Sequence, residues 1–197
     1  MRMTRIVNRF ALATLVAAMP ALAPAQTAGL SIEQRLQRVE DQLAIQRILI
    51  NYHAYLDSRN IGAYVSLFAK DGEWVNGSLV RKGPAQIREL LTGLFGNTPP
   101  GWVNTESYTH TTNIQIDLHG DRATARSRHL LVKRGPDGSP VPTLAGRYED
   151  ELIREDGHWK ILRRVDYPVL PTAEEWGKIM QARRAATATA ERPKEPK

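Results

Sequence analysis

The sequence contains no cysteine, and it carries neither a glycine-rich phosphate loop nor a Gly-x-Ser-x-Gly motif. The first absence excludes disulfide bonds, thiolate metal sites and a cysteine nucleophile. The other two remove the usual signatures of nucleotide-binding proteins and serine hydrolases. The lack of cysteine does not argue against export, because an oxidising compartment permits disulfides without requiring them.

A single long apolar run is present, and it lies at the N-terminus. Basic residues at positions 2, 5 and 9 precede the run from Phe10 to Met19, and the small residues Ala23-Pro24-Ala25 follow it. This order is typical of a cleavable secretory signal. We expect residues 1–25 to be removed near Ala25, leaving a secreted or periplasmic protein without stable membrane association. The alternative is a short membrane anchor, although the run is about half the length that spans a bilayer.

The positive charge of the chain is concentrated at its ends. The formal net charge is +6, but residues 26–170 carry nearly equal numbers of basic and acidic residues. Nucleic-acid binding requires a basic face on the folded domain, whereas this segment offers only short clusters such as Arg126 with Arg128. We therefore expect no nucleic-acid partner.

The first part of the mature chain has helical periodicity. Ser31 followed by Gln34 matches a capping box, and apolar residues recur at helical spacing from Leu36 to Leu56, which predicts a long helix ending near Asp57. A second helix is expected over 61–68, with Asp71-Gly72 turning the chain out of it. A third is expected over 84–96, after a hairpin at Asn76-Gly77.

The later part of the chain has a period of two. Alternation predicts strands over 105–117, 123–131, 144–154 and 159–167, with a turn at Gly120-Asp121. Helices followed by antiparallel strands indicate an α+β domain over 26–170, with three helices on one face of a curved sheet around an internal cavity. Residues 171–197 are expected to form a C-terminal helix to about Arg184 and a disordered basic tail.

Two histidines are predicted to face inward. Alternation places His110 on the side of its strand that holds the isoleucines, and His129 on the small-residue side of the next strand. If the strands pair through Gly120-Asp121, His110 faces Leu131 and lies diagonal to His129, within side-chain reach. They form either a pair of hydrogen-bonded core histidines or part of an active site.

Charged and phenolic residues complete the candidate site. Asp57 either caps the following segment or orients an imidazole, which would make His110 a general base near neutral pH. Tyr52, five residues earlier, could present a phenol to the same pocket. Arg163 or Arg164 must point inward, and Asp150 is the nearest partner for a buried guanidinium.

A metal ion would need further ligands. His53 and Asp57 have the helical spacing that two metal ligands could use, but no third ligand is evident. We therefore expect no metal and no cofactor.

The combined motifs resemble the SnoaL-like branch of the nuclear transport factor two-like superfamily over residues 33–168. The resemblance rests on Leu56-Asp57 before an amphipathic helix, on Gly120-Asp121-Arg122-Ala123, and on Gly146-Arg147-Tyr148 leading to 156–159 (DGHW). It implies a cone-shaped, mostly antiparallel sheet with helices around a deep apolar cavity.

The resemblance also implies site residues. In the lyase members an Asp at the end of the first helix pairs with a His on the first long strand, which would be Asp57 and His110. A Tyr five residues before that Asp matches Tyr52, and an Arg on the last strand matches Arg164, with Arg163 as the alternative. One departure is that the relatives' His stands four residues before the Asn of this strand, whereas His110 stands three before it.

The implied reaction is a cofactor-free, dehydratase-like elimination or isomerisation of a hydrophobic small molecule. His110 would remove a proton, and Tyr52 or an inward Arg would stabilise the developing oxyanion. We expect substrate contacts from His129, Tyr148, Trp74 and Phe68. Family members often pair through the open sheet face, so a homodimer is expected. The alternatives are a non-catalytic binding protein and a dioxygenase small subunit, the latter disfavoured by the signal.

Overall fold

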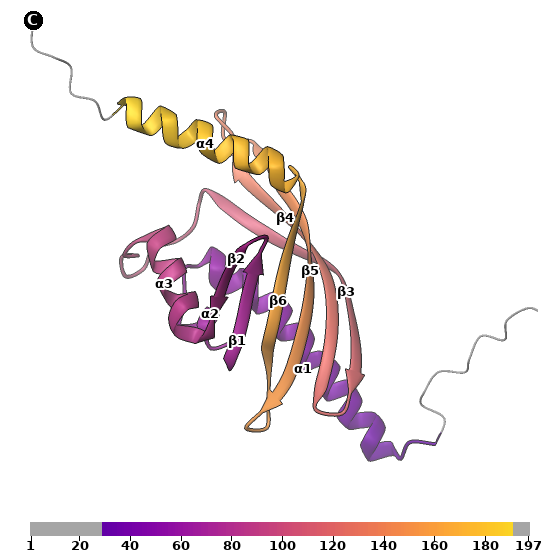
Figure 1. Ribbon diagram of the computed structural model, residues 1–197. Coiled ribbons are helices and arrows are strands. Elements are labelled where there is room, and N and C mark those ends of the chain that lie inside the picture. Colours follow the sequence, from indigo (N-terminus) through magenta and orange to yellow (C-terminus); the bar gives the residue numbers. More distant parts are fainter. Residues whose placement is uncertain (1–28, 191–197) are drawn as a thin grey trace, which may run out of the picture.

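The computed structural model describes residues 29–190 (Figure 1). The predicted signal segment and the tail 191–197 lie outside the described residues. The elements follow in the order α1 (Ile32–Asp57), α2 (Ile61–Val65), β1 (Phe68–Asn76), β2 (Leu79–Lys82), α3 (Gly83–Phe95), β3 (Ser107–His119), β4 (Arg122–Arg134), β5 (Pro140–Glu155), β6 (His158–Leu170) and α4 (Ala173–Ala190).

The six strands form one curved sheet in the order β2-β1-β6-β5-β4-β3. Only β1 and β6 run parallel, and the other neighbours are antiparallel. The long helix α1 packs against β3 and β6, while α3 packs against β1 and β2 (Figure 1). The predicted α+β class, with helices on one side of a curved sheet, is confirmed.

Helix α1 begins where the capping pattern predicts. The Ser31 hydroxyl accepts a hydrogen bond from the Gln34 backbone, and the Gln34 side chain accepts one from the Ser31 backbone N–H. The two bonds satisfy donors that a helix start leaves unpaired. The helix then runs without interruption to Asp57, so it carries its last turns into the centre of the domain.

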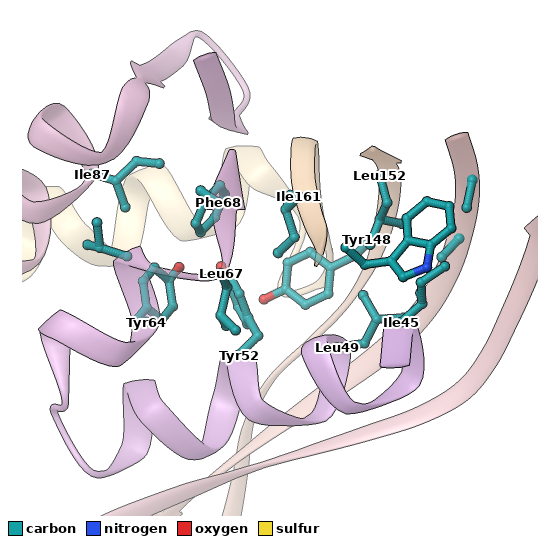
Figure 2. Close-up of a cluster of buried hydrophobic side chains, with 14 of the residues drawn as sticks. Ile45, Leu49, Tyr52, Tyr64, Leu67, Phe68, Ile87, Tyr148, Leu152 and Ile161 are labelled. Carbon is teal, nitrogen blue, oxygen red and sulfur yellow. The ribbon is translucent and has the colours of Figure 1, made fainter. Parts of the chain in front are cut away.

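The core lies between α1 and the central strands (Figure 2). Ile45 and Leu49 from α1 are fully buried, as is Ile161 from β6. Tyr148 reaches from β5 into the same cluster and meets Tyr52 of α1, with the two ring centroids 5.5 Å apart (Figure 2). Aromatic side chains with polar ends thus stand at the boundary between the core and the candidate site.

The predicted second helix is too long. It ends at Val65, and Phe68 starts β1 by pairing with Ile161 of β6. Asp71-Gly72 is an irregularity within this strand rather than a turn. A Cβ at Gly72 would lie 2.8 Å from the Ile161 carbonyl oxygen, so glycine is needed for β1 to approach β6.

A β-bulge in β3 changes the predicted register. Near the turn Leu118 pairs with Ala123, as predicted, but beyond Asn113 the pairing slips by one residue and Thr111 lies opposite His129. Asn113 takes a φ of 52°, the left-handed conformation that asparagine tolerates better than most residues. One extra residue reverses the faces of everything N-terminal to it.

The prediction that His110 faces inward is therefore wrong. His110 is exposed, and its Nε2 lies 3.2 Å from the hydroxyl of the exposed Tyr108. Thr109 and Thr111 take the inward face instead.

The C-terminal helix α4 follows the last strand and crosses the end of the sheet (Figure 1). Thr172 and Glu175 cap its start reciprocally, and the helix extends past the predicted end near Arg184 to Ala190. Over residues 29–190, every helix is too short or too polar to cross a bilayer.

The positive φ of Asn113 in the bulge predicts how substitutions there change the free energy of unfolding. Asn113→Val should lower the free energy of unfolding by about 1–2 kcal/mol, because a β-branched residue is strained at positive φ, whereas Asn113→Gly should be nearly neutral. Gln115→Val, at an exposed position in the same strand outside the bulge, is the matched control. Urea unfolding provides the measurement, and equal midpoints for the Asn113→Val and Gln115→Val variants would contradict the assignment.

Candidate functional site

A cavity of about 310 Å³ opens between the end of α1, the end of α3 and strands β4 to β6. Apolar side chains cover part of its wall, and titratable groups from α1, β4, β5 and β6 cover another part. The apolar members are Leu56, Phe95, Leu131 and Leu144; the titratable and phenolic members include His53, Asp57, His129, Tyr148 and Asp166. A concave, mostly apolar space with a few convergent polar groups is the usual form of a small-molecule site.

His129 on β4 is held by a carboxylate and by an aromatic ring. Its Nε2 lies 3.1 Å from Oδ1 of Asp166, and the side-chain amide of Asn76 donates a 3.0 Å hydrogen bond to Oδ2 of the same carboxylate. The imidazole stacks on Tyr148, with ring centroids 4.4 Å apart. Because the carboxylate can only accept, it selects the tautomer with the proton on Nε2 and leaves Nδ1 with a free lone pair.

Gly146 makes this position of His129 possible. The two residues are cross-strand partners, and a Cβ on Gly146 would lie 2.3 Å from Nε2 of His129. No side chain fits at that distance, so glycine is required for the imidazole to reach Asp166. The Gly146-Arg147-Tyr148 segment thus supplies the space for the His129 imidazole, at Gly146, and the phenol ring that stacks on it, at Tyr148.

His53 on α1 is a second buried imidazole, which sequence reasoning considered only as a possible metal ligand. Its Nδ1 lies 2.6 Å from Oγ1 of Thr111, and its Nε2 lies 3.2 Å from the Tyr148 hydroxyl. Burial, the Arg164 guanidinium and the neighbouring His129 hold the pKa of His53 well below its usual value. His53 is therefore neutral, and its helical spacing from Leu49 was the signal that it points inward.

Arg164 lies behind the cavity wall. It is fully buried and forms two hydrogen bonds with Asp150, of 2.6 and 2.9 Å, so it is the inward member of the Arg163–Arg164 pair that alternation left open. Its guanidinium carbon lies 3.9 Å from the Tyr52 ring centroid and 4.3 Å from that of Tyr148. Burial opposes the charged form, but Asp150 outweighs it and raises the pKa of Arg164. The alternative residue, Arg163, is partly exposed beside glutamates.

Asp57 lines the cavity without the predicted imidazole partner. It accepts hydrogen bonds from the Thr109 backbone N–H at 2.7 Å and from the Thr109 hydroxyl at 3.2 Å. Burial raises the pKa of Asp57, although the bonds from Thr109 act in the opposite direction. Thr109 stands four residues before Asn113, which is the position where the resemblance places a histidine.

The other predicted site residues, Tyr52, Trp74 and Phe68, do not line this cavity. Tyr52 and Trp74 line a second cavity of about 360 Å³, and the Trp74 indole donates a 2.9 Å hydrogen bond to the Tyr52 hydroxyl. Phe68 is buried in the core beside Tyr52 and Tyr64. The two cavities share four lining residues, namely Leu56, Phe95, Tyr148 and Asp166.

Metal ligands are not grouped in the described part of the chain. No cluster of three or more histidine, aspartate, glutamate or cysteine residues among positions 29–190 could hold a metal ion. The site that the structure describes is therefore an arrangement of imidazoles, phenols and carboxylates.

The SnoaL-like domain model matches residues 37–165, which are most of the described chain. The protein belongs to the SnoaL-like domain family. It is 26% identical to the γ-hexachlorocyclohexane dehydrochlorinase of Sphingobium indicum over 132 residues, which cover 66% of this chain and 81% of that protein. It is 27% identical to an uncharacterised protein of Mycobacterium tuberculosis over 135 residues, which cover 65% of this chain and 85% of that protein.

Solved structures agree with the fold. An NTF2-like protein with a cystatin-like fold from Novosphingobium aromaticivorans superimposes with a TM-score of 0.61 at 23% identity, covering 71% of this chain and 89% of that one. A hexachlorocyclohexane dehydrochlorinase from Novosphingobium barchaimii gives a TM-score of 0.56 at 23% identity, covering 68% of this chain and 90% of that one. At this identity the likeness supports the curved sheet and its helices.

The buried neutral His53 predicts a pH dependence of stability. Below pH 6.5 His53 is protonated in the unfolded chain but stays neutral in the folded one. The contribution of His53 to the free energy of unfolding is therefore complete above pH 6.5 and is lost as the pH falls. Between pH 7 and 5 the loss should reach up to about 2 kcal/mol. His53→Gln should remove this part of the slope in denaturant titrations, while His158→Gln, at the exposed first residue of β6, should keep it. Identical slopes for all three proteins would refute the assignment.

Gly146→Ala should displace His129 from Asp166. We expect a loss of about 1–3 kcal/mol in the free energy of unfolding, as for other overpacked sites, together with a changed His129 tautomer equilibrium in ¹⁵N NMR spectra. Gly93→Ala is the control, because a Cβ there meets no atom within 4 Å. An unchanged His129 spectrum in the Gly146→Ala protein would show that the glycine does not position the imidazole.

Proposed function

We propose that this protein is a cofactor-free enzyme that removes a proton from a hydrophobic small molecule, leading to elimination or isomerisation. The observation that carries the proposal is the oriented His129–Asp166 pair lining a concave, partly apolar cavity. This pair takes the role that sequence reasoning assigned to His110 and Asp57. His110 is not available to pair with Asp57, because it lies on the outer face of β3.

His129 is suited to act as the base. With Nε2–H directed at Asp166, its Nδ1 has no hydrogen-bond partner within the described residues and can accept a proton from carbon. The carboxylate keeps the ring oriented and stabilises the imidazolium that forms. The electron pair of the broken C–H bond then forms a double bond as a leaving group departs, or enters the adjoining carbonyl as an enolate.

Tyr148 is suited to stabilise the developing negative charge. Burial raises its pKa well above the usual value, so the phenol keeps its proton and can donate a hydrogen bond. His53 holds the hydroxyl from one side, and the Arg164 charge lies behind the ring. A prearranged donor in a water-poor site is an effective stabiliser of an oxyanion or departing group.

The similarity to a dehydrochlorinase supports this class of reaction, because dehydrochlorination is a proton removal coupled to departure of chloride. The N-terminal signal pattern supports a location outside the cytoplasm. Both the export and the hydrophobic substrate are part of the proposal.

A second candidate is ligand binding without catalysis. It is favoured by Thr109, which occupies the position where the resemblance places the catalytic histidine and which hydrogen-bonds the Asp57 carboxylate. In that case the imidazoles would serve only to bind polar groups of the ligand.

One experiment separates the two candidates. A ligand recovered by mass spectrometry from protein purified out of its native cells is returned to the protein in D₂O. An enzyme that removes a proton from carbon should convert the ligand or introduce deuterium into it, whereas a binding protein returns it unchanged.

The same assay tests the assignment of the base. His129→Ala should lower the rate roughly 100- to 10,000-fold, the usual contribution of a general base, while His110→Ala should leave it unchanged. Circular dichroism checks that both variants fold. A protein whose rate depends on His110 and not on His129 would disprove the proposed mechanism.

A further inference from the structure

Helix α1 carries large apolar side chains on the side that faces away from the domain. They are Ile32, Leu36, Val39, Leu43 and Ile50, with exposed fractions of 76%, 58%, 51%, 55% and 47%. Leucine, isoleucine and valine are rarely left this exposed in a row on a monomeric protein, and contiguous exposed apolar surface marks an interaction site. We refer to these five residues as the α1 stripe.

The α1 stripe is separate from the face that packs on the sheet. Asp41, Ile45, Leu49 and Tyr52 are the buried residues of the inner face. By helical geometry the stripe projects from the opposite side of the same helix. The N-terminal turns of α1 also extend past the ends of the neighbouring strands (Figure 1), so the stripe lies clear of the fold that would otherwise cover it.

The spacing within the α1 stripe is that of a coiled-coil seam. The intervals from Ile32 to Leu43 are four, three and four residues, and Ile50 follows one heptad after Leu43. Apolar residues repeating at this period pack against a second helix that carries the same pattern. A helix segment with so little packing of its own is only marginally stable in water, so a partner helix would also stabilise the start of α1.

We propose that the α1 stripe binds the α1 stripe of a second copy of this chain, as a parallel two-stranded coiled coil. This interface is independent of the proposed function. It differs from the open sheet face that family resemblance suggests for pairing. The sheet of each copy would lie on the outer side of its own helix, so the two domains do not compete for the same space.

Charge favours the parallel orientation. In a heptad written abcdefg, Leu36 and Leu43 occupy a positions, which puts Arg35 at a g position and Glu40 at the following e position. In a parallel coiled coil the g residue of one helix lies beside the following e residue of the other helix. Neither Arg35 nor Glu40 has an ion-pair partner among the residues that the structure describes. In an antiparallel pair g faces g, and the g positions hold Arg35, Gln42 and Leu49, none of which is acidic.

Sedimentation velocity on the purified full chain over a range of concentrations tests the interface. Wild type should dimerise reversibly, and Leu36→Lys/Leu43→Lys should be monomeric with an unchanged fold by circular dichroism. Val103→Lys, at a loop position that is 74% exposed, is the control and should dimerise like wild type. A monomeric wild type, including one that instead binds phospholipid vesicles, or a dimer that survives the double lysine change, would overturn the proposal.

Charge exchange tests the orientation. Arg35→Glu converts two attractive contacts per dimer into repulsive ones and should raise the dissociation constant about tenfold. The double variant Arg35→Glu/Glu40→Arg restores opposite charges and should return the constant close to the wild-type value. A double variant as weak as the single one would refute the parallel arrangement.

Discussion

The buried ion pair between Arg164 and Asp150 constrains the centre of the molecule. The two residues are direct cross-strand partners on β6 and β5, and both side chains are removed from solvent. Breaking such a pair leaves an uncompensated buried charge and costs about 3–5 kcal/mol. The guanidinium also contacts the rings of Tyr52 and Tyr148, so α1 and β5 are both positioned against it.

The same pair explains the different roles of the two buried histidines. Burial, assisted by the positive charge of Arg164, lowers the pKa of His53 and keeps it neutral, so this imidazole links Thr111 and Tyr148 by hydrogen bonds. His129 lies against the carboxylate of Asp166, which can stabilise a protonated ring. Tyr148 stands between them, bonded to one imidazole and stacked on the other. The arrangement separates a base from a hydrogen-bond donor within one cavity.

Much of the fold follows from local sequence patterns. The Ser31 capping box, the Gly120-Asp121 turn and strand alternation predicted the long helix, the antiparallel strands and one inward arginine, Arg163 or Arg164, near Asp150. These features depend on neighbours in sequence or on one hairpin register. The Phe68 region was assigned wrongly because its pairing with Ile161 of β6 is a distant contact.

The site was harder to predict, because one inserted residue reverses a strand. Side-chain alternation assigns faces by residue number alone, and the residue number does not show that Asn113 adopts a positive φ. His110 was consequently placed inside and Thr109 outside. The residues that form the site, His53, His129 and Asp166, come from α1, β4 and β6, and their proximity depends on the curvature of the whole sheet. The need for glycine at position 146 likewise depends on the position of the His129 imidazole next to it, which the sequence does not give.

We propose that His129, oriented by Asp166, is the imidazole that contacts the ligand. Long-range ¹H–¹⁵N spectra of histidine-labelled protein, recorded with and without the ligand recovered from native cells, test it most directly. We expect His129 to carry its proton on Nε2, and its Nδ1 resonance to shift on binding while that of His110 does not. A shift confined to His110, or a His129 proton on Nδ1, would contradict it.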